Sequence, residues 1–159
     1  MTHQLNFIYN DSDWIAPAEY PDLSKATEIA IDLETKDPNI KTKGPGWATF
    51  DGHIVGFAVA ALGQQWYFPI AHDAGGNMDL SITCAWMQDV LKTDATKIFH
   101  NASYDVGWLL VNGFEIRGKI VDTMIAAALI NENRFSFSLN ACAKDYLGEI
   151  KNETFLNEK

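Results

Sequence analysis

Two carboxylates, Asp32 and Glu34, stand two residues apart at the end of a short apolar run. The run over residues 29–33 is rich in β-branched side chains and is followed by a polar segment, which is typical of a buried strand. Residues two apart on a strand project from the same face, so both carboxylates point to one side. Two like charges so close repel each other, and a divalent metal ion would neutralise them. An edge strand with two solvated acids would show the same local pattern.

A second group of polar side chains follows at a predicted strand-to-helix turn. Residues 97–99 are a short strand candidate, and the spacing of residues 102–111 predicts a helix that ends before Gly113. Asn101 and Asp105 therefore lie at a strand end, where catalytic groups gather in α/β sheets. Each also has a structural interpretation: Asn101 as the helix N-cap, and Asp105 as a first-turn acid favoured by the helix dipole.

The elements that would position these residues alternate between strand and helix patterns. Two strand-like runs, 53–61 and 65–70, predict a hairpin, and a further short strand is expected at residues 5–9. Helical spacing predicts a helix over 80–91 and another that starts after Asp122 and runs to about Ile130. A third helix is predicted over 139–147, with Gly148 as its stop. The apolar faces are Ile82, Ala85, Trp86 and Val90 in the first of these helices, and Leu139, Cys142, Ala143, Tyr146 and Leu147 in the last. Breakers within residues 36–52 predict a loop. We expect one α/β domain with a mixed sheet, made of a lead-in (1–26), a core (27–148) and a tail (149–159).

The composition narrows the class of protein. A chain of 159 residues is large enough for one domain with a real core. It has no apolar run of the roughly 20 residues needed to span a bilayer and no signal-peptide pattern, so a cytoplasmic location without membrane contact is expected. Cys84 and Cys142 belong to no CxxC pair, which gives a zinc site no support.

The formal net charge of −9 argues against a domain that holds nucleic acid by a broad basic surface. It is compatible with an enzyme that grips one phosphate through metal ions. A local basic cluster, Lys36, Lys41 and Lys43, follows the Asp32–Glu34 segment directly. It is interpreted either as a contact for a nucleic-acid backbone or as an ordinary solvated loop.

The ordered set Asp32-x-Glu34 and Asn101-x-x-Tyr104-Asp105 resembles the first two motifs of the DEDD exonuclease superfamily. It is most similar to the 3′→5′ proofreading domain of family A, DNA polymerase I-like enzymes, including those of phages. The similarity extends to segments 54–60, 66–72, 121–124 and 138–143, and covers residues 27–150. The resemblance implies a ribonuclease H-like mixed β-sheet flanked by helices. It also implies two-metal hydrolysis of the 3′-terminal phosphodiester of single-stranded or frayed DNA.

The resemblance also assigns roles to individual residues. Asp32, Glu34 and Asp105 would be the catalytic ligands of two divalent ions, Mg²⁺ or Mn²⁺, with Asp32 bridging both. The residues implied to contact the terminal nucleotide or its phosphate are Thr35, Asn101 and Tyr104. The implied partners are a single-stranded DNA 3′ end and a polymerase domain in the same or an associated chain. Apolar candidates for stacking against the terminal base are Leu33, Pro38, Phe57 and Trp108, each of which could equally be core.

One departure from the family pattern concerns its third motif, Tyr-x-x-x-Asp or His-x-x-x-x-Asp, which supplies the fourth carboxylate. Tyr146 is followed four residues later by Ile150, and no histidine occurs after His100. We therefore expect a domain truncated at its C-terminus, with weak exonuclease activity as an isolated chain.

No other acid is assigned the fourth position. Asp122 is interpreted as the N-cap of the following helix, and Glu149, Glu153 and Glu158 lack the motif. Two alternatives stay open: a ribonuclease D-like 3′→5′ exoribonuclease, and a catalytically incomplete scaffold or binding module of the same fold.

Overall fold

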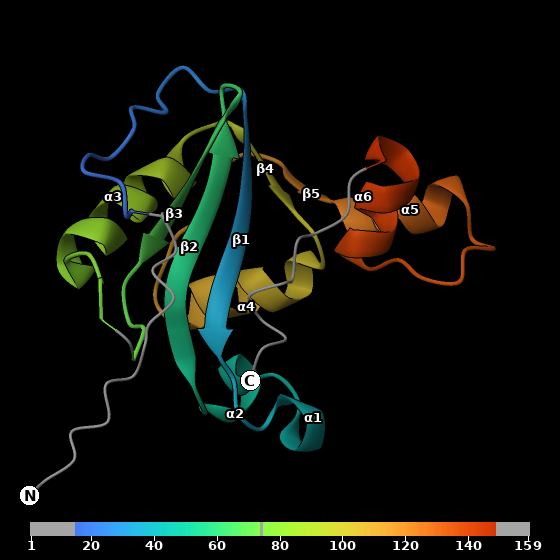
Figure 1. Ribbon diagram of the computed structural model, residues 1–159, viewed down its shortest axis with the longest axis horizontal. Coiled ribbons are helices and arrows are strands. Elements are labelled where there is room, and N and C mark those ends of the chain that lie inside the picture. The colour runs from blue at the N-terminus through green and yellow to red at the C-terminus, as the bar shows by residue number, and fades with distance from the viewer. Residues whose placement is uncertain (1–14, 74, 149–159) are drawn as a thin grey trace, which may run out of the picture.

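The computed structural model describes residues 15–73 and 75–148, and within them five strands form one mixed sheet in the order β3-β2-β1-β4-β5 (Figure 1). The strands are β1 (Glu28–Lys36), β2 (His53–Ala61), β3 (Gln64–Pro69), β4 (Thr96–Phe99) and β5 (Ile120–Asp122). β1 lies at the centre, antiparallel to β2 and parallel to β4. The edge-strand interpretation is therefore wrong, because β1 pairs with β2 on one side and, over Glu28–Ala30, with β4 on the other.

The predicted hairpin is confirmed as β2 and β3, joined by the two residues Leu62 and Gly63. Both have positive φ, 54° and 73°. A two-residue turn of this kind matches the right-handed twist of the strands it joins. The hairpin places β3 beside β2 and away from β1.

The hydrophobic core lies on one face of the sheet. Ile29, Ile31 and Leu33 of β1 join it, together with residues from helices α3 (Leu80–Lys92) and α4 (Ala102–Val111). Because side chains alternate along a strand, Asp32 and Glu34 point to the opposite face. The apolar face predicted for the helix over 80–91, which is α3, is partly wrong. Ile82 is exposed, while Thr83 and Met87 are buried.

A fully buried lysine ties the end of α3 to β4. The Lys97 Nζ donates to the backbone carbonyls of Thr93, Ala95 and Arg117 and to the Thr93 hydroxyl. Burial lowers the pKa of the Lys97 ammonium, against the opposing influence of Asp94. These acceptors make burial of the charge tolerable and anchor the loop that precedes β4.

The segment expected to be a loop, residues 36–52, contains two one-turn helices, α1 (Ile40–Lys43) and α2 (Gly46–Thr49). α2 packs against α4, where a Cβ at Gly46 would lie 2.9 Å from the Trp108 ring. Helices this short have little periodicity for a sequence pattern to reveal. The three-residue strand β5 was not predicted either.

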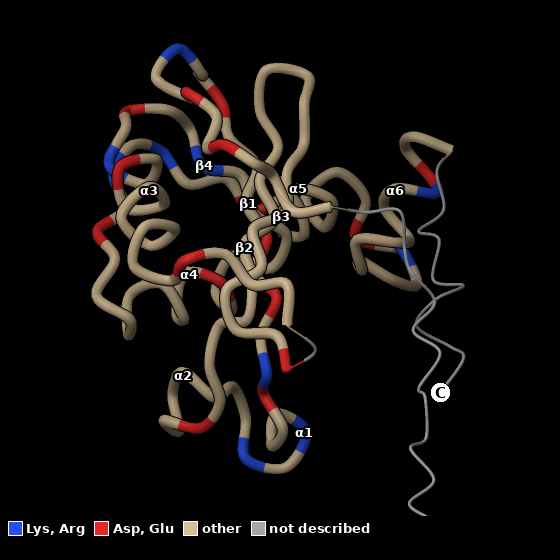
Figure 2. Tube along the Cα trace, turned by 60° about the vertical axis from the view of Figure 1, so that its left-hand side comes forward, with Lys and Arg blue, Asp and Glu red and all other residues tan. Residues whose placement is uncertain are grey.

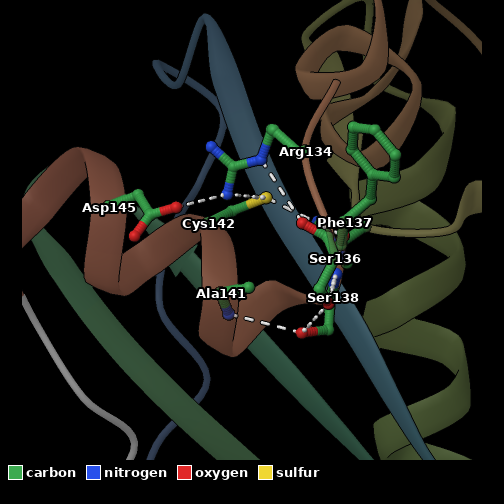
Figure 3. Close-up of polar contacts among 8 residues, drawn as sticks. Arg134, Ser136, Phe137, Ser138, Ala141, Cys142 and Asp145 are labelled. Atoms are coloured by element: carbon green, nitrogen blue, oxygen red, sulfur yellow. Dashed lines mark hydrogen bonds and ion pairs between the residues drawn. The ribbon is translucent and has the colours of Figure 1, made fainter. Parts of the chain in front are cut away.

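The last two helices, α5 (Thr123–Ile130) and α6 (Leu139–Leu147), lie beside the β5 end of the sheet (Figure 1). The Arg134 guanidinium joins the connecting loop to α6 through a 2.9 Å ion pair with Asp145 (Figure 3). It also lies 4.9 Å from the centre of the Tyr146 ring. The hydroxyl of Ser138 caps α6 by accepting from the Ala141 N–H at 3.3 Å. The predicted bounds of this helix and its stop at Gly148 are confirmed.

The apolar face predicted for α6 is exposed among the described residues, since Leu139, Tyr146 and Leu147 are each at least half accessible. The predicted strand at residues 5–9 and the tail 149–159 lie outside the described residues, and the division into lead-in, core and tail stays a prediction. In residues 15–73 and 75–148, no helix has the length and apolar character that a membrane crossing requires.

Candidate active site

Asp32 and Glu34 are both exposed on the face of β1 that is turned away from the core. The register between β1 and β2 shifts between Glu34 and Thr35, because Glu34 pairs with Gly56 and Thr35 with Ile54. Val55 is thus an extra residue on β2. Such bulges bend a strand and re-aim its side chains, and they are common beside active sites.

Asp105 of α4 reaches the same strand. Its Oδ1 accepts a hydrogen bond from the Leu33 N–H at 3.2 Å, and its side chain is only 3% exposed. Burial and, after it, the charge of Asp32 raise the pKa of Asp105 to about 7. Asp105 therefore lies against the segment of β1 that carries Asp32 and Glu34, and close enough to Asp32 for the two charges to interact.

These carboxylates fit a divalent cation by their chemistry. No three His, Cys, Asp or Glu side chains of the described part of the chain form a ready metal-binding group. The charge of Asp32 nevertheless opposes ionisation of the buried Asp105. A cation between them would remove that opposition, and carboxylate oxygens are the ligands that Mg²⁺ and Mn²⁺ prefer.

Thr35 and Tyr104 lie together, and their hydroxyls are 2.8 Å apart. Tyr104 donates to the Asp37 carboxylate at 3.0 Å, so it accepts from Thr35. Asp37 also accepts from the Gly46 N–H at 2.8 Å. Burial raises the pKa of the Tyr104 phenol. These hydrogen bonds join the end of β1, the start of α4 and the start of α2.

Asn101 occupies the N-cap position of α4, but its side chain makes no capping bond, and its backbone is left-handed (φ 68°, ψ 55°). The Asp122 carboxylate takes over that role by accepting from the Asn101 N–H at 3.1 Å and the Ala102 N–H at 2.8 Å. Interpreting the Asn101 side chain as the helix cap was therefore wrong. Its amide stays exposed at the strand end.

Asp122 is the N-cap of α5, as predicted, and it serves two helices at once. It accepts from the Met124 N–H at 2.9 Å in addition to its bonds with α4. Partial burial works to raise the pKa of Asp122, but its backbone N–H donors hold that pKa below the ordinary value. The Asp122 carboxylate thus accepts hydrogen bonds from the first N–H groups of both α4 and α5, which leaves it poorly suited as the fourth metal ligand.

A groove of about 940 Å³ runs beside Asp32 on the carboxylate face of the sheet. Small side chains, Ala30, Ala58 and Ala60, form part of its floor, and Tyr67 and His100 line it. Sequence reasoning missed Tyr67, whose position depends on the pairing of β3 with β2. Of the base-stacking candidates, Leu33, Phe57 and Trp108 are buried in the core, and only Pro38 is exposed.

The basic cluster begins where β1 ends and continues around α1, which Figure 2 shows as blue segments. Lys36 forms a 2.8 Å ion pair with Asp73, and Lys43 lies 3.9 Å from Asp51. All three lysines are exposed. Their positive charge is therefore close to the carboxylate face and partly balanced by local acids.

The comparison with known families shows to which family the chain belongs. The model of the 3′→5′ exonuclease family of A-type DNA polymerases matches residues 18–157. The chain belongs to this exonuclease family. Both quoted motifs, Asp32-x-Glu34 and Asn101-x-x-Tyr104-Asp105, fall within the matched range.

Relatives of this family member include two phage polymerases. The chain is 33% identical over 157 residues to a DNA-directed DNA polymerase of Pseudomonas phage M6, an alignment that covers 94% of the chain and 24% of the polymerase. It is 29% identical over 143 residues to the DNA polymerase DpoZ of Salmonella phage PMBT28, covering 89% and 20%. The chain spans about a quarter or less of the length of these relatives.

Solved structures place this member of the exonuclease family in the ribonuclease H-like exonuclease fold. Brucella melitensis NrnC with bound Mg²⁺ superposes with a TM-score of 0.59 at 19% identity, covering 82% of this chain and 58% of NrnC. Escherichia coli RNase D, an exoribonuclease, gives a TM-score of 0.60 at 17% identity, covering 86% and 32%. The predicted fold class is thereby confirmed.

Proposed function

We propose that the chain is the proofreading 3′→5′ exonuclease domain of a DNA polymerase, which hydrolyses the 3′-terminal phosphodiester of single-stranded or frayed DNA. One observation carries the proposal: the buried Asp105 accepts a hydrogen bond from the N–H of Leu33, and Leu33 lies between Asp32 and Glu34 on β1. Membership of the exonuclease family and similarity to phage DNA polymerases support it.

Asp32, Glu34 and Asp105 are the residues proposed to hold two divalent ions, Mg²⁺ or Mn²⁺. When bound, such ions activate the attacking water and neutralise charge on the scissile phosphate. Glu34 is exposed and would also accept a hydrogen bond from the attacking water. Asp105 would ionise on binding, since a cation offsets the burial and repulsion that raise its pKa.

Three further residues are proposed to contact the substrate. The exposed amide of Asn101 would donate to the terminal nucleotide or its phosphate. Thr35 and Tyr104 would contribute through the hydroxyl pair at the end of β1. Because the tyrosine hydroxyl already bonds to Asp37, its contribution would lie chiefly in fixing Thr35 and the following turn.

The polymerase domain is proposed to lie in the same or an associated polypeptide, as in the phage relatives. Such a domain would supply the basic surface for DNA that an acidic chain of net charge −9 lacks. The sequence contains no third motif after Tyr146, so the 159-residue chain by itself is proposed to be weakly active.

The test measures Mn²⁺-dependent shortening of 5′-labelled single-stranded DNA and RNA by the 159-residue chain and by the complete polypeptide of its source gene. We expect strong DNA shortening by the complete polypeptide, loss of that activity in Asp32→Ala, and much less activity from the short chain. Faster turnover of RNA would favour the ribonuclease D-like alternative, which the fold similarity to RNase D keeps open. A complete polypeptide that binds DNA without hydrolysing it would favour the scaffold alternative.

A further inference from the structure

Tyr67 of β3 lies on the same face of the sheet as Asp32 and Glu34. Asp32 pairs with Ala58 of β2, and Ala58 pairs with Tyr67, so the three residues form one row across the sheet. Residues paired across neighbouring strands point to the same side. Tyr67 therefore belongs to the carboxylate face, and it lines the groove beside Asp32.

Gly56 provides the space that lets the Tyr67 ring reach the neighbouring row. Gly56 is the β2 partner of Glu34. A Cβ at position 56 would lie 2.0 Å from the Tyr67 hydroxyl oxygen and 2.4 Å from the ring carbon that carries it. The phenol thus fills the space that a side chain opposite Glu34 would occupy, and any residue larger than glycine would displace it.

His72 holds the phenol in this position. Its Nε2 is hydrogen bonded to the Tyr67 hydroxyl, and the two rings meet edge to face with centroids 5.8 Å apart. Asn77 in turn fixes the backbone of His72 by accepting from its N–H at 2.7 Å and donating to its carbonyl at 2.9 Å. The hydroxyl therefore has a defined place beside the row of Glu34.

The negative charge of Glu34 affects the ionisation of the Tyr67 phenol. Burial and, after it, the negative charge of Glu34 raise the pKa of Tyr67 to about 12. A tyrosine phenol, whose ordinary pKa is about 10, carries its proton at neutral pH in any case. The phenol has a single O–H, so it can donate to the Glu34 carboxylate when His72 Nε2–H is the donor in its own bond to the hydroxyl oxygen.

We propose that Tyr67, held over Gly56 by His72, is a positioning residue that orients the Glu34 carboxylate for metal binding; the metal role rests on the proposed function. Neither Tyr67 nor His72 belongs to the Asp32-x-Glu34 or Asn101-x-x-Tyr104-Asp105 motif. Hydrogen-bonded neighbours of a metal-binding carboxylate restrict its orientation, and their loss commonly costs about 10–100-fold in metal affinity or activity.

The first test compares Tyr67→Phe, which removes only the hydroxyl, with Tyr20→Phe as a matched control. Tyr20 also uses its hydroxyl, in a 2.7 Å hydrogen bond with Thr83, and its ring stacks on Phe68 within the core. Calorimetric titration of the full chain with Mn²⁺ should give a dissociation constant about tenfold higher for Tyr67→Phe and unchanged for Tyr20→Phe. An unchanged affinity in Tyr67→Phe, or an equal loss in both variants, overturns the proposal.

A second readout needs no metal. The ¹³C resonance of the Glu34 carboxyl, assigned with Glu34→Gln, should shift in Tyr67→Phe and stay in place in Tyr20→Phe. If it does not move in Tyr67→Phe, the phenol does not orient Glu34 and the proposal fails. Gly56→Ala should reproduce both effects, with no further loss in the Gly56→Ala/Tyr67→Phe double variant. Additive losses in that double variant would count against a shared mechanism.

Asp32→Asn separates this inference from the proposed function. Mn²⁺ binding that is lost in Asp32→Asn and unaffected in Tyr67→Phe overturns the role of Tyr67 alone. Wild-type chain that binds no Mn²⁺ overturns the proposed metal site and, with it, the metal role of Tyr67.

Discussion

The backbone N–H of Leu33 donates a hydrogen bond of 3.2 Å to the Asp105 carboxylate. Leu33 separates Asp32 from Glu34, so this bond fastens α4 to β1 at the point where the two strand carboxylates emerge. Asp105 consequently supports the site structurally as well as supplying a proposed metal ligand. Substitutions at Asp105 separate these two contributions when charge and hydrogen bonding are removed one at a time.

Asp105→Asn should flatten the pH dependence of stability in the metal-free protein. The pKa of Asp105 is raised to about 7 in the folded chain, so folding is favoured while the carboxyl is protonated. That contribution is complete below the unfolded pKa of about 4 and is lost as pH rises towards 7. Asparagine keeps an acceptor for Leu33 without the charge, so urea unfolding in EDTA should show a gain in stability that grows from pH 4 to pH 8. Parallel pH profiles for both proteins would contradict this prediction.

Asp122→Ala should destabilise the chain by about 1–3 kcal/mol, because one N-cap contributes about 0.5–2 kcal/mol and this carboxylate caps both α4 and α5. Asp79→Ala is the matched control, since Asp79 caps α3 alone through the Ile82 N–H. The lowered pKa of Asp122 means that its contribution is present above about pH 4 and is lost as pH falls below that value. Urea unfolding at pH 7 measures the difference, and a smaller loss in Asp122→Ala than in Asp79→Ala would refute the double cap.

Lys97→Met should cost about 2–4 kcal/mol, because it leaves the buried carbonyls of Ala95 and Arg117 without their donor. Lys92→Met serves as the control. Lys92 is exposed and lies 3.7 Å from Glu115, a surface pair whose loss should change stability by about 0.5 kcal/mol or less. Thermal unfolding compares the two variants, and similar midpoints would show that Lys97 is not a structural anchor.

Tyr104→Phe should loosen the segment from Asp37 to Gly46. The substitution removes the bond that Tyr104 accepts from Thr35 and the bond that it donates to Asp37, at a cost of about 1–2 kcal/mol. Hydrogen exchange should become faster at the Gly46 N–H, which donates to Asp37. Tyr146→Phe on the exposed face of α6 should leave this exchange unchanged. Equal protection of Gly46 in all three proteins would mean that the tyrosine does not hold the turn.

Neutralising Lys36, Lys41 and Lys43 to Gln should reduce the salt dependence of DNA binding if these lysines contact the backbone. Each phosphate contact on single-stranded DNA contributes about 0.7 to the slope of log affinity against log salt. Lys36 is already paired with Asp73, so the combined change should stay below the sum for three full contacts. Fluorescence anisotropy across a salt series measures the slope. The exposed lysines Lys25, Lys92 and Lys119, changed in the same way, provide the control, and an identical slope in both triple variants would assign the cluster to a solvated loop.

Local patterns predicted much of the scaffold. The apolar alternation of β1, the hairpin of β2 and β3 and the bounds of α4 and α6 all follow from periodicity and from glycine stops within a few residues. The short elements β5, α1 and α2 were not predicted, because three or four positions show no clear period. The exposure of Ile82 was not predicted, because the packing of α3 against the sheet, and not its composition, decides which face is buried.

By itself, the sequence determined which residues could do the chemistry: the spacing of Asp32 and Glu34 on a strand, and the spacing of Asn101, Tyr104 and Asp105 at a helix start. These relations depend on backbone geometry over a few residues, which residue type and period encode directly. Only the tertiary structure decided the environment of those groups. The raised pKa of Asp105, the capping of two helices by Asp122 and the fit of Tyr67 over Gly56 each join segments far apart in the chain. Burial, charge proximity and steric room are properties of that assembled packing, so no local pattern can carry them.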